Sequence, residues 1–227
     1  EDYFFRFAKD KIFIDIQKDL HESGVTFDEV FSERSLFESG EVDQCLELLS
    51  EKGKLYEKDG ALWLKTQDGG DDKDRVLRKS GGEYTYLMPD LAYHRKKFER
   101  GYDLVVNLLG PDHHGYIARL KAGVSDLGYD SNKIKILIVQ LTTLFRNGEP
   151  VRMSTRKGEF VTYRELLDEV GVDATRFFFL MRRIESHLDF DLELAKKKSD
   201  ENPVYYLQYA HARICSILKK SEQPVQS

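Results

Sequence analysis

The feature that most constrains the fold is a strand, turn, helix and strand pattern between residues 104 and 141. Residues 104–109 form a continuous apolar run of strand length, and Gly110 begins the turn that follows. The apolar residues after the turn recur on one helical face that ends at Gly128, namely Ile117, Leu120, Val124 and Leu127. A second apolar run, residues 134–141, completes a βαβ unit of the length found in parallel sheets. We therefore predict an α/β fold whose two parallel strands are buried.

Short strands and helices precede this unit. Segments 54–64, 74–79 and 83–86 are separated by pairs of turn residues, which is typical of small antiparallel hairpins. The helical spacing of apolar residues predicts helices over residues 2–21 and 42–51. We interpret the β-rich stretch as a small subdomain inserted into a larger fold.

Beyond residue 141 the pattern becomes helical. Side chains that accept hydrogen bonds precede each expected helix, because such residues satisfy the free amides of a first turn. Three helix starts are predicted: a capping box at Thr162 and Glu165, a cap at Asp173 before residues 174–182, and Asn202-Pro203 before a helix reaching about residue 219.

The composition is that of a globular protein with an acidic balance. The 227 residues carry a net charge of −5, which argues against non-specific coating of nucleic acid, DNA included, although local basic patches can still contact phosphates. Cys45 and Cys215 are isolated and give no disulfide framework, which favours a reducing, cytoplasmic compartment. No apolar run approaches the roughly 18 residues that a membrane-spanning helix requires.

A polar loop dense in cations occupies residues 151–158, directly after an Asn147-Gly148 turn. Arg152, Arg156 and Lys157 place three positive charges within six residues, and the small residues of the loop let its backbone approach an anion closely. Such a loop is suited to binding phosphates. Short basic clusters are also common on solvated surface loops, so that alternative stays open.

Asp112, His113 and His114 follow the first predicted strand, at the edge of a parallel sheet where ligands collect. An aspartate there can accept both ribose hydroxyls of a nucleotide, and a neighbouring imidazole can contact the base or the phosphates. The alternative is that Asp112 caps the next helix while the histidines are exposed. A zinc site that includes His94 is disfavoured, because adjacent histidines are awkward chelators and no ligand spacing is completed.

Tyr86 and Asp90 lie four residues apart around the start of a predicted helix, so their side chains can project to one side. A carboxylate accepts both N–H bonds of a guanidinium, and an aromatic face tolerates its plane. The pair can therefore bind a cationic ligand. An N-terminal cap beside a core tyrosine is the alternative interpretation.

Several segments together resemble those of bacterial arginyl-tRNA synthetases in sequence, order and spacing. The matching segments are residues 85–94, 110–116, 151–158, 171–177, 188–191 and 202–214. The resemblance covers nearly the whole chain and implies a class I aminoacyl-tRNA synthetase with a Rossmann-like catalytic core. Members of this family activate L-arginine with ATP and Mg²⁺ and then esterify tRNA(Arg) in cytoplasmic protein synthesis.

The resemblance also implies roles for the residues singled out above. Tyr86 and Asp90 would belong to the arginine pocket. The ATP-binding residues would be Gly110, Asp112, His113 and His114. The signature loop that holds the triphosphate would supply the catalytic residues Arg152, Met153, Ser154, Arg156 and Lys157. No metal ligand is implied within this chain.

Two departures from the family pattern limit the expected activity. Thr155 stands where the usual Lys-Met-Ser-Lys core of the loop ends in lysine, and we expect Arg156 or Lys157 to compensate. The other signature of the class, His-Ile-Gly-His or a close variant, does not occur in these 227 residues. We therefore interpret the chain as an internal fragment that is inactive alone.

The resemblance predicts two functional regions. Residues 1–170 would be a partial catalytic domain, the second half of the core, with the insertion at about residues 38–84 and the signature loop at 151–158. Connecting helices and the start of a helical anticodon-binding domain would follow at residues 171–227. The alternatives are a catalytically silent RNA-binding or interaction module that reuses the fold, and another class I synthetase.

Overall fold

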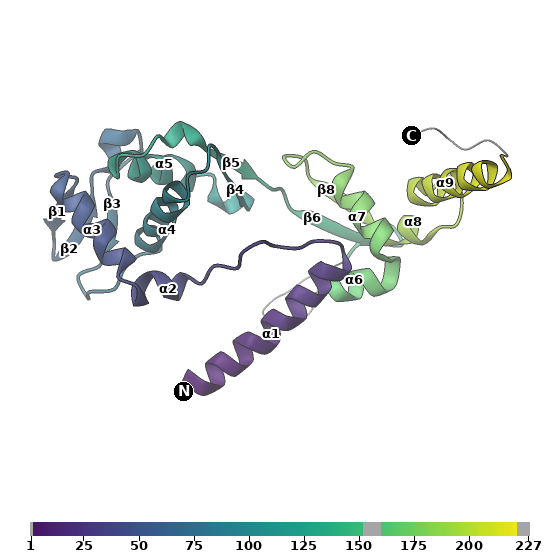
Figure 1. Ribbon diagram of the computed structural model, residues 1–227, viewed down its shortest axis with the longest axis horizontal. Helices are drawn as coiled ribbons and strands as arrows, with labels where there is room; N and C mark the ends of the chain where they lie inside the picture. Colours follow the sequence, from purple (N-terminus) through teal and green to yellow (C-terminus); the bar gives the residue numbers. More distant parts are fainter. Residues whose placement is uncertain (1, 152–159, 222–227) are drawn as a thin grey trace. The chain divides into compact units, whose positions relative to one another are not determined.

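The computed structural model describes residues 2–151 and 160–221, and the chain divides into two compact units (Figure 1). The terminal unit joins both ends of the sequence, Glu1–Asp28 and Leu141–Ser227. The central unit is the continuous segment Glu29–Gln140. The chain therefore begins the terminal unit, builds the central unit, and then returns to complete the first.

The central unit contains a small antiparallel sheet. Its strands follow the order β1 (Leu55–Lys58), β2 (Ala61–Leu64) and β3 (Arg75–Arg78). Asp59 and Gly60 both have positive φ, as the two-residue turn between β1 and β2 requires. The predicted hairpins are confirmed, except that residues 83–86 contribute only a single bridge, between Arg78 and Tyr84.

The predicted βαβ unit is confirmed in the central unit. It consists of strand β4 (Val105–Leu109), helix α5 (Tyr116–Asp126) and strand β5 (Ile134–Ile138). The two strands pair in parallel, from Val105 opposite Ile134 to Leu109 opposite Ile138. The expectation of buried strands holds for one face only, since Val105 is buried whereas Leu108 on the opposite face is 63% exposed.

Four helices share one apolar core with this strand pair. They are α2 (Glu33–Glu38), α3 (Glu41–Glu51), α4 (Leu87–Glu99) and α5. Helices α2 and α3 reach this core by packing against α4. Helix α3 confirms the predicted helix over residues 42–51, with Leu49 fully buried in the core. A Cβ on Gly123 of α5 would lie 2.6 Å from Leu91 Cδ2, so this glycine lets α4 and α5 approach closely.

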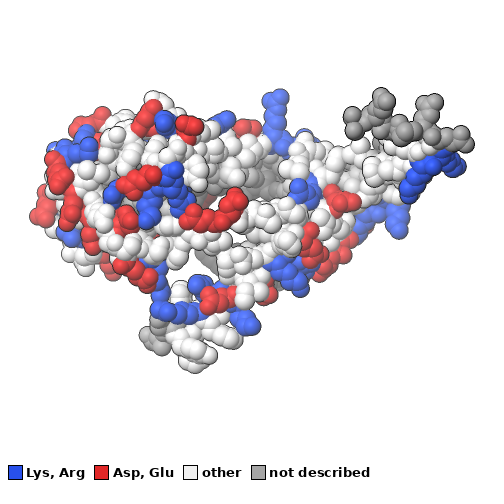
Figure 2. All heavy atoms as spheres, in the orientation of Figure 1, with Lys and Arg blue, Asp and Glu red and all other residues white. Residues whose placement is uncertain are grey.

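Acidic and basic side chains are mixed over the face of the central unit that Figure 2 shows. Many of them form ion pairs between elements, such as Lys96 of α4 with Glu41 of α3 at 2.8 Å. This face carries no extended patch of a single sign, in keeping with the modest net charge of −5.

The terminal unit has its own three-stranded sheet, which the sequence pattern did not predict. The order is β7 (Glu149–Pro150), β6 (Thr142–Arg146) and β8 (Leu188–Asp191). Strand β6 pairs with β7 in antiparallel fashion and with β8 in parallel. The predicted strand over residues 134–141 is therefore corrected: β5 ends at Ile138, and a new strand begins at Thr142. The expectation of a helical region beyond residue 141 is wrong where β6, β7 and β8 lie.

The described helices of the terminal unit are α1 (Asp2–Glu22), α6 (Tyr163–Val170), α7 (Val172–Leu180), α8 (Leu192–Lys196) and α9 (Pro203–Lys220). Helix α8 packs against β6 of this sheet, and α6, α7 and α9 follow through helix–helix contacts. The capping box of α6 at Thr162 and Glu165 and the Asn202 cap of α9 are confirmed. The predicted cap at Asp173 is wrong, because α7 begins at Val172 and Gly171 is its N-cap residue.

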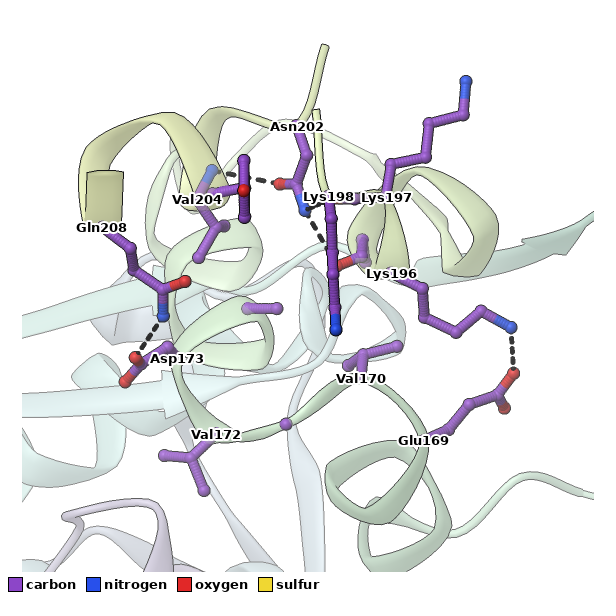
Figure 3. A pocket seen from close by; sticks show the side chains of 14 residues that line it. Glu169, Val170, Val172, Asp173, Lys196, Lys197, Lys198, Asn202, Val204 and Gln208 are labelled. Atoms are coloured by element: carbon purple, nitrogen blue, oxygen red, sulfur yellow. Dashed lines mark hydrogen bonds and ion pairs between the residues drawn. The ribbon is translucent and has the colours of Figure 1, made fainter. Parts of the chain in front are cut away.

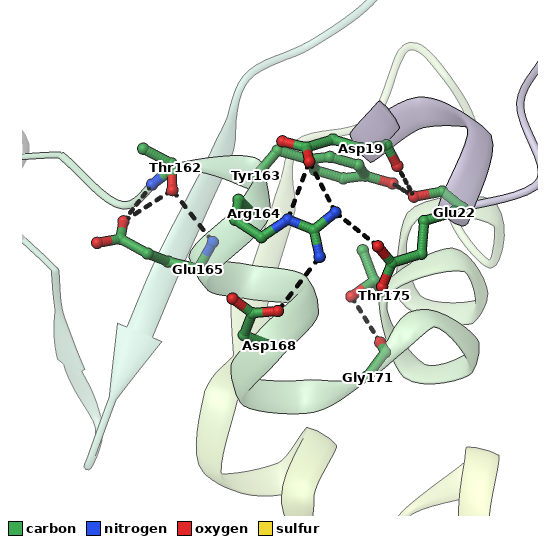
Figure 4. A network of polar contacts seen from close by, with 10 residues as sticks. Asp19, Glu22, Thr162, Tyr163, Arg164, Glu165, Asp168, Gly171 and Thr175 are labelled. Carbon is green, nitrogen blue, oxygen red and sulfur yellow. Dashed lines mark hydrogen bonds and ion pairs between the residues drawn. The ribbon is translucent and has the colours of Figure 1, made fainter. Parts of the chain in front are cut away.

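An arginine fastens helix α1 to helix α6 (Figure 4). The Arg164 guanidinium donates hydrogen bonds to Asp19 Oδ1 at 2.7 Å, to Glu22 Oε2 at 2.7 Å and to Asp168 Oδ1 at 3.2 Å. The predicted opening helix is confirmed, but the apolar residues that recur along it are exposed, among them Phe5, Ile12 and Ile16. Polar contacts near its carboxyl end therefore contribute much of the anchoring of α1.

Candidate functional site

Helix α4 places Tyr86 and Asp90 around its first turn. Tyr86 is the residue just before the helix, and Asp90 lies within the first turn. The Asp90 carboxylate does not cap the helix, since it accepts a hydrogen bond from the phenol of Tyr116, the first residue of α5. The capping alternative for Asp90 is wrong, and α5 brings a third side chain to the pair.

Tyr116 is the residue of this cluster that sequence reasoning missed. It is 7% exposed, and its ring centroid lies 5.5 Å from that of Tyr86 and 6.1 Å from that of His113. Burial, and then the charge of Asp90, raise the pKa of Tyr116 above its ordinary value, so the phenol remains a donor. Its position at the end of the segment 110–116 was the signal available in the sequence.

A guanidinium lies beside these phenols, and it belongs to Arg119 on helix α5. Its Nη1 donates a hydrogen bond to the Tyr86 hydroxyl, and its Cζ lies 5.6 Å from the centroid of the Tyr116 ring. Its Nε is buried and has no hydrogen-bond partner among the described residues. The phenols therefore accept a planar cation in this region of the structure.

The turn after β4 opens at Gly110 and contains a short 3₁₀ helix, Pro111–His113. The Asp112 carboxylate makes no capping hydrogen bond; its side chain is 80% exposed and lies 3.6 Å from His113 Nε2. A Cβ at position 110 would lie 2.8 Å from Asp112 Oδ1, so glycine permits this close turn. The capping alternative for Asp112 is therefore wrong, and its carboxylate is accessible to a ligand.

A cavity of about 360 Å³ brings most of these side chains together. It is lined by Tyr86, Asp112, His113, Gly115, Tyr116 and Arg119. Three of the residues predicted from the sequence, Tyr86, Asp112 and His113, therefore line the same cavity near the carboxyl end of β4. Asp90 is connected to the cavity through the Tyr116 hydroxyl, whereas Gly110 and His114 are not among its lining residues.

Other predicted residues lie elsewhere or outside the described part of the chain. The loop residues Arg152, Met153, Ser154, Arg156 and Lys157 fall in the segment that the structure does not describe. His94, the third histidine of the disfavoured zinc site, is a buried residue of α4 and contacts Asn107 of β4. Within residues 2–151 and 160–221, no three His, Cys, Asp or Glu side chains gather in a way that could hold a metal ion.

A second cavity, of about 530 Å³, lies among α6, α7, α8 and α9 in the terminal unit (Figure 3). Two of the lysines around it form ion pairs. Lys196 contacts Glu169 and Glu193 at 2.9 Å each, and Lys197 pairs with Glu201. None of the predicted site residues that the structure describes lines this cavity, and its ion pairs connect α8 to neighbouring segments.

The chain matches the family of class I tRNA synthetases (R), catalytic domain, over residues 1–183. It therefore belongs to this family of class I catalytic domains. A crystal structure from Campylobacter jejuni, assigned as an arginyl-tRNA synthetase, superposes with a TM-score of 0.88 at 40% identity and covers 96% of this chain and 48% of that one. The predicted α/β fold class is confirmed.

Curated relatives point to one amino acid. The chain is 54% identical over 222 residues to the arginine–tRNA ligase of Anoxybacillus flavithermus, covering 98% of this chain and 39% of the relative. It is 56% identical over 220 residues to the arginine–tRNA ligase of Syntrophotalea carbinolica, covering 97% of this chain and 40% of the relative. The chain thus spans about two fifths of the length of these relatives. No helix in the described ranges has the length and apolar character needed to cross a membrane.

Proposed function

We propose that this chain is part of a longer arginyl-tRNA synthetase, which activates L-arginine with ATP and transfers it to tRNA(Arg) in the cytoplasm. The observation that carries the proposal is the cavity where Tyr86 and Tyr116 meet beside the Asp90 carboxylate. The identity of 54% to an arginine–tRNA ligase over nearly the whole chain supports the same conclusion.

The arginine side chain is proposed to bind at Asp90 and Tyr86. A carboxylate accepts two N–H bonds from a guanidinium, and the neighbouring phenol faces can pack against its plane. The contact of Arg119 with Tyr86 and Tyr116 supports this assignment, because it is a contact of the same chemistry. Tyr116 has a different role: its hydroxyl orients the Asp90 carboxylate.

ATP is proposed to bind on the other side of this cavity. The exposed Asp112 carboxylate would accept the ribose hydroxyls, with Gly110, His113 and His114 near the adenosine. The arginine carboxylate oxygen then forms a bond to the α-phosphorus, and the bond to the pyrophosphate oxygen breaks. Arg152, Met153, Ser154, Arg156 and Lys157 would hold the departing phosphates, since positioning and charge neutralisation carry most of such catalysis. Mg²⁺ would enter with ATP, because it binds mainly through substrate phosphates and water.

Exchange of labelled pyrophosphate into ATP by the full-length protein tests the proposal. We expect exchange that depends on arginine, measured with and without tRNA, and background exchange from the isolated 227-residue chain. Exchange with another amino acid in place of arginine would identify a different class I synthetase. No exchange with any amino acid, together with retained tRNA binding, would indicate a non-catalytic RNA-binding module.

A further inference from the structure

A row of polar side chains is buried between helix α4 and strand β4. Asn107 stands in the middle of the apolar strand and His94 in the middle of the helix, and both are buried. Lys97, one turn after His94, is half-buried and completes the row. Each buried polar group costs free energy unless it is hydrogen-bonded, so such a row in an apolar core requires an explanation.

The hydrogen bonds of the row run from one end to the other. Lys97 Nζ donates to Asn107 Oδ1 at 3.0 Å. The Asn107 amide nitrogen lies 2.7 Å from His94 Nε2. On the other side of the ring, His94 Nδ1 lies 2.8 Å from the backbone carbonyl oxygen of Asp90. The row therefore begins at the Lys97 ammonium group and ends at Asp90. The carboxylate of Asp90 in turn accepts the hydrogen bond from the Tyr116 hydroxyl.

The direction of these bonds follows from the ammonium group. Lys97 can only donate, so the atom of Asn107 that faces it must be the carbonyl oxygen. The Asn107 amide then donates to His94 Nε2, which must be unprotonated. The proton of the neutral imidazole consequently lies on Nδ1 and is donated to the Asp90 carbonyl. Burial, and then the charge of Lys97, lower the pKa of His94, which agrees with a neutral ring.

We propose that Lys97, Asn107 and His94 are positioning residues that hold Asp90 in the orientation for binding arginine. The proposal rests on the proposed function above. Asp90 is fixed at two points: its backbone carbonyl by the row from β4, and its carboxylate by Tyr116 of α5. A displacement of about 1 Å at a binding group can cost on the order of 100-fold in rate. The row thus sets where the first turn of α4 presents its carboxylate.

A structural role alone explains the row less well. Replacing both partners of a buried hydrogen bond by apolar groups of the same shape is often nearly neutral or stabilising. Apolar residues at these positions would therefore hold α4 against β4 without the desolvation cost. What they would lack is the directional constraint on the Asp90 carbonyl, because dispersion contacts tolerate small rotations that hydrogen bonds do not.

Asn107→Asp in the full-length protein gives the sharpest test. The change keeps the shape and the acceptor for Lys97, but it replaces the amide donor to His94 by a carboxylate oxygen and so adds a negative charge beside the ring. We expect the KM for arginine in pyrophosphate exchange to rise about 10- to 100-fold, with little change in the KM for ATP. Val105→Ala is the matched control, because it removes two methyl groups from the same buried face of β4 and leaves the hydrogen bonds of the row intact. Equal effects of both variants on the arginine KM would overturn the proposal.

Two further measurements keep the test decisive if Asn107→Asp folds poorly. Lys97→Met removes the cation without adding a buried charge. Like Asn107→Asp, it should raise the KM for arginine. ¹⁵N spectra of histidine-labelled unsubstituted protein, assigned with His94→Gln, should show a neutral ring protonated on Nδ1. Protonation of Nε2 there, or an unchanged arginine KM in Lys97→Met, would overturn the proposal. A lack of arginine-dependent exchange in the unsubstituted protein would instead reject the proposed function.

Discussion

The hydroxyl of Tyr116 donates a hydrogen bond to the carboxylate of Asp90, and this bond joins the first turn of α4 to the first turn of α5. Each residue belongs to a segment that the sequence marked separately, residues 85–94 and residues 110–116. The bond makes one site of the two segments. It also means that changes at either residue alter the same carboxylate.

Asp90→Ala in the full-length protein should impair the use of arginine far more than the use of ATP. A guanidinium without its charged acceptor should lose on the order of 2–4 kcal/mol, or about 30- to 1000-fold in kcat/KM for arginine. Steady-state pyrophosphate exchange with each substrate varied in turn is the measurement. Asp103→Ala, which removes an exposed carboxylate from the loop before β4, is the control. Equal rises in the KM for both substrates would remove Asp90 from the arginine pocket.

Neutralising Arg156 and Lys157 together should slow adenylate formation while arginine binding stays nearly intact. The phosphate charge is concentrated away from the amino-acid side chain, and cationic loops commonly tighten around the transition state. Single-turnover formation of arginyl-adenylate by the full-length double variant checks this. Thr155 stands where the family motif has its second lysine. A normal rate of adenylate formation would show that Arg156 and Lys157 do not replace that lysine.

Arg164→Met should loosen helix α1. Removing the guanidinium leaves the carboxylates of Asp19 and Glu22 close together without the cation that both of them contact. Amide hydrogen exchange followed by mass spectrometry should show faster exchange in the carboxyl half of α1. Lys197→Met, which breaks an exposed ion pair with Glu201, should leave that exchange unchanged. Unaltered protection of α1 in Arg164→Met would show that the apolar contacts of the helix suffice.

The stability of the protein should fall as the pH drops below about 6.5 in a way that depends on His94. Burial, and then the charge of Lys97, depress the folded-state pKa of His94 below its ordinary value of 6.5. The Asp90 charge opposes this effect but is smaller, and the group facing the ring from β4 is the neutral Asn107. Between the folded and unfolded pKa values the unfolded chain binds more protons, so this contribution is complete above pH 6.5 and decreases toward acid.

Urea unfolding above and below pH 6.5 measures this contribution. His94→Gln should show a shallower loss of stability toward acid than the unsubstituted protein. His21→Gln, which changes an exposed histidine of α1, should keep the full pH dependence. The same slope in all three proteins would mean that His94 is protonated in the folded state as readily as in the unfolded state.

Local patterns allowed much of the central unit to be predicted. The strands β4 and β5, helix α5 and the hairpin turn at Asp59 and Gly60 all depend on residues close in sequence, as does the capping box at Thr162 in the terminal unit. Strands β6 and β8 were missed because their pairing joins segments more than forty residues apart, and neither has a long apolar run. Asp173 has the residue type of a cap, but the helix begins at Val172, and Gly171, with a φ of 82°, is the N-cap residue.

The candidate site shows the same division. Residue type and spacing singled out Tyr86, Asp90, Asp112 and His113, because these are unusual residues at the ends of predicted elements. Tyr116 and Arg119 resemble ordinary residues of an amphipathic helix. Only the packing of α5 against α4 brings them to the other side chains. Their roles depend on tertiary contacts, which the spacing of residues along the sequence does not show.

The contact of Arg164 with Asp19 has a consequence for synthesis on the ribosome. The two residues are 145 positions apart, with the whole central unit between them. At about 5–20 residues per second, Asp19 waits roughly 7 to 30 s for its partner. During that interval Asp19 has no arginine to contact, while the central unit, which is continuous, can already fold. The attachment of α1 to α6 through Arg164 therefore forms only after the whole central unit has been synthesised.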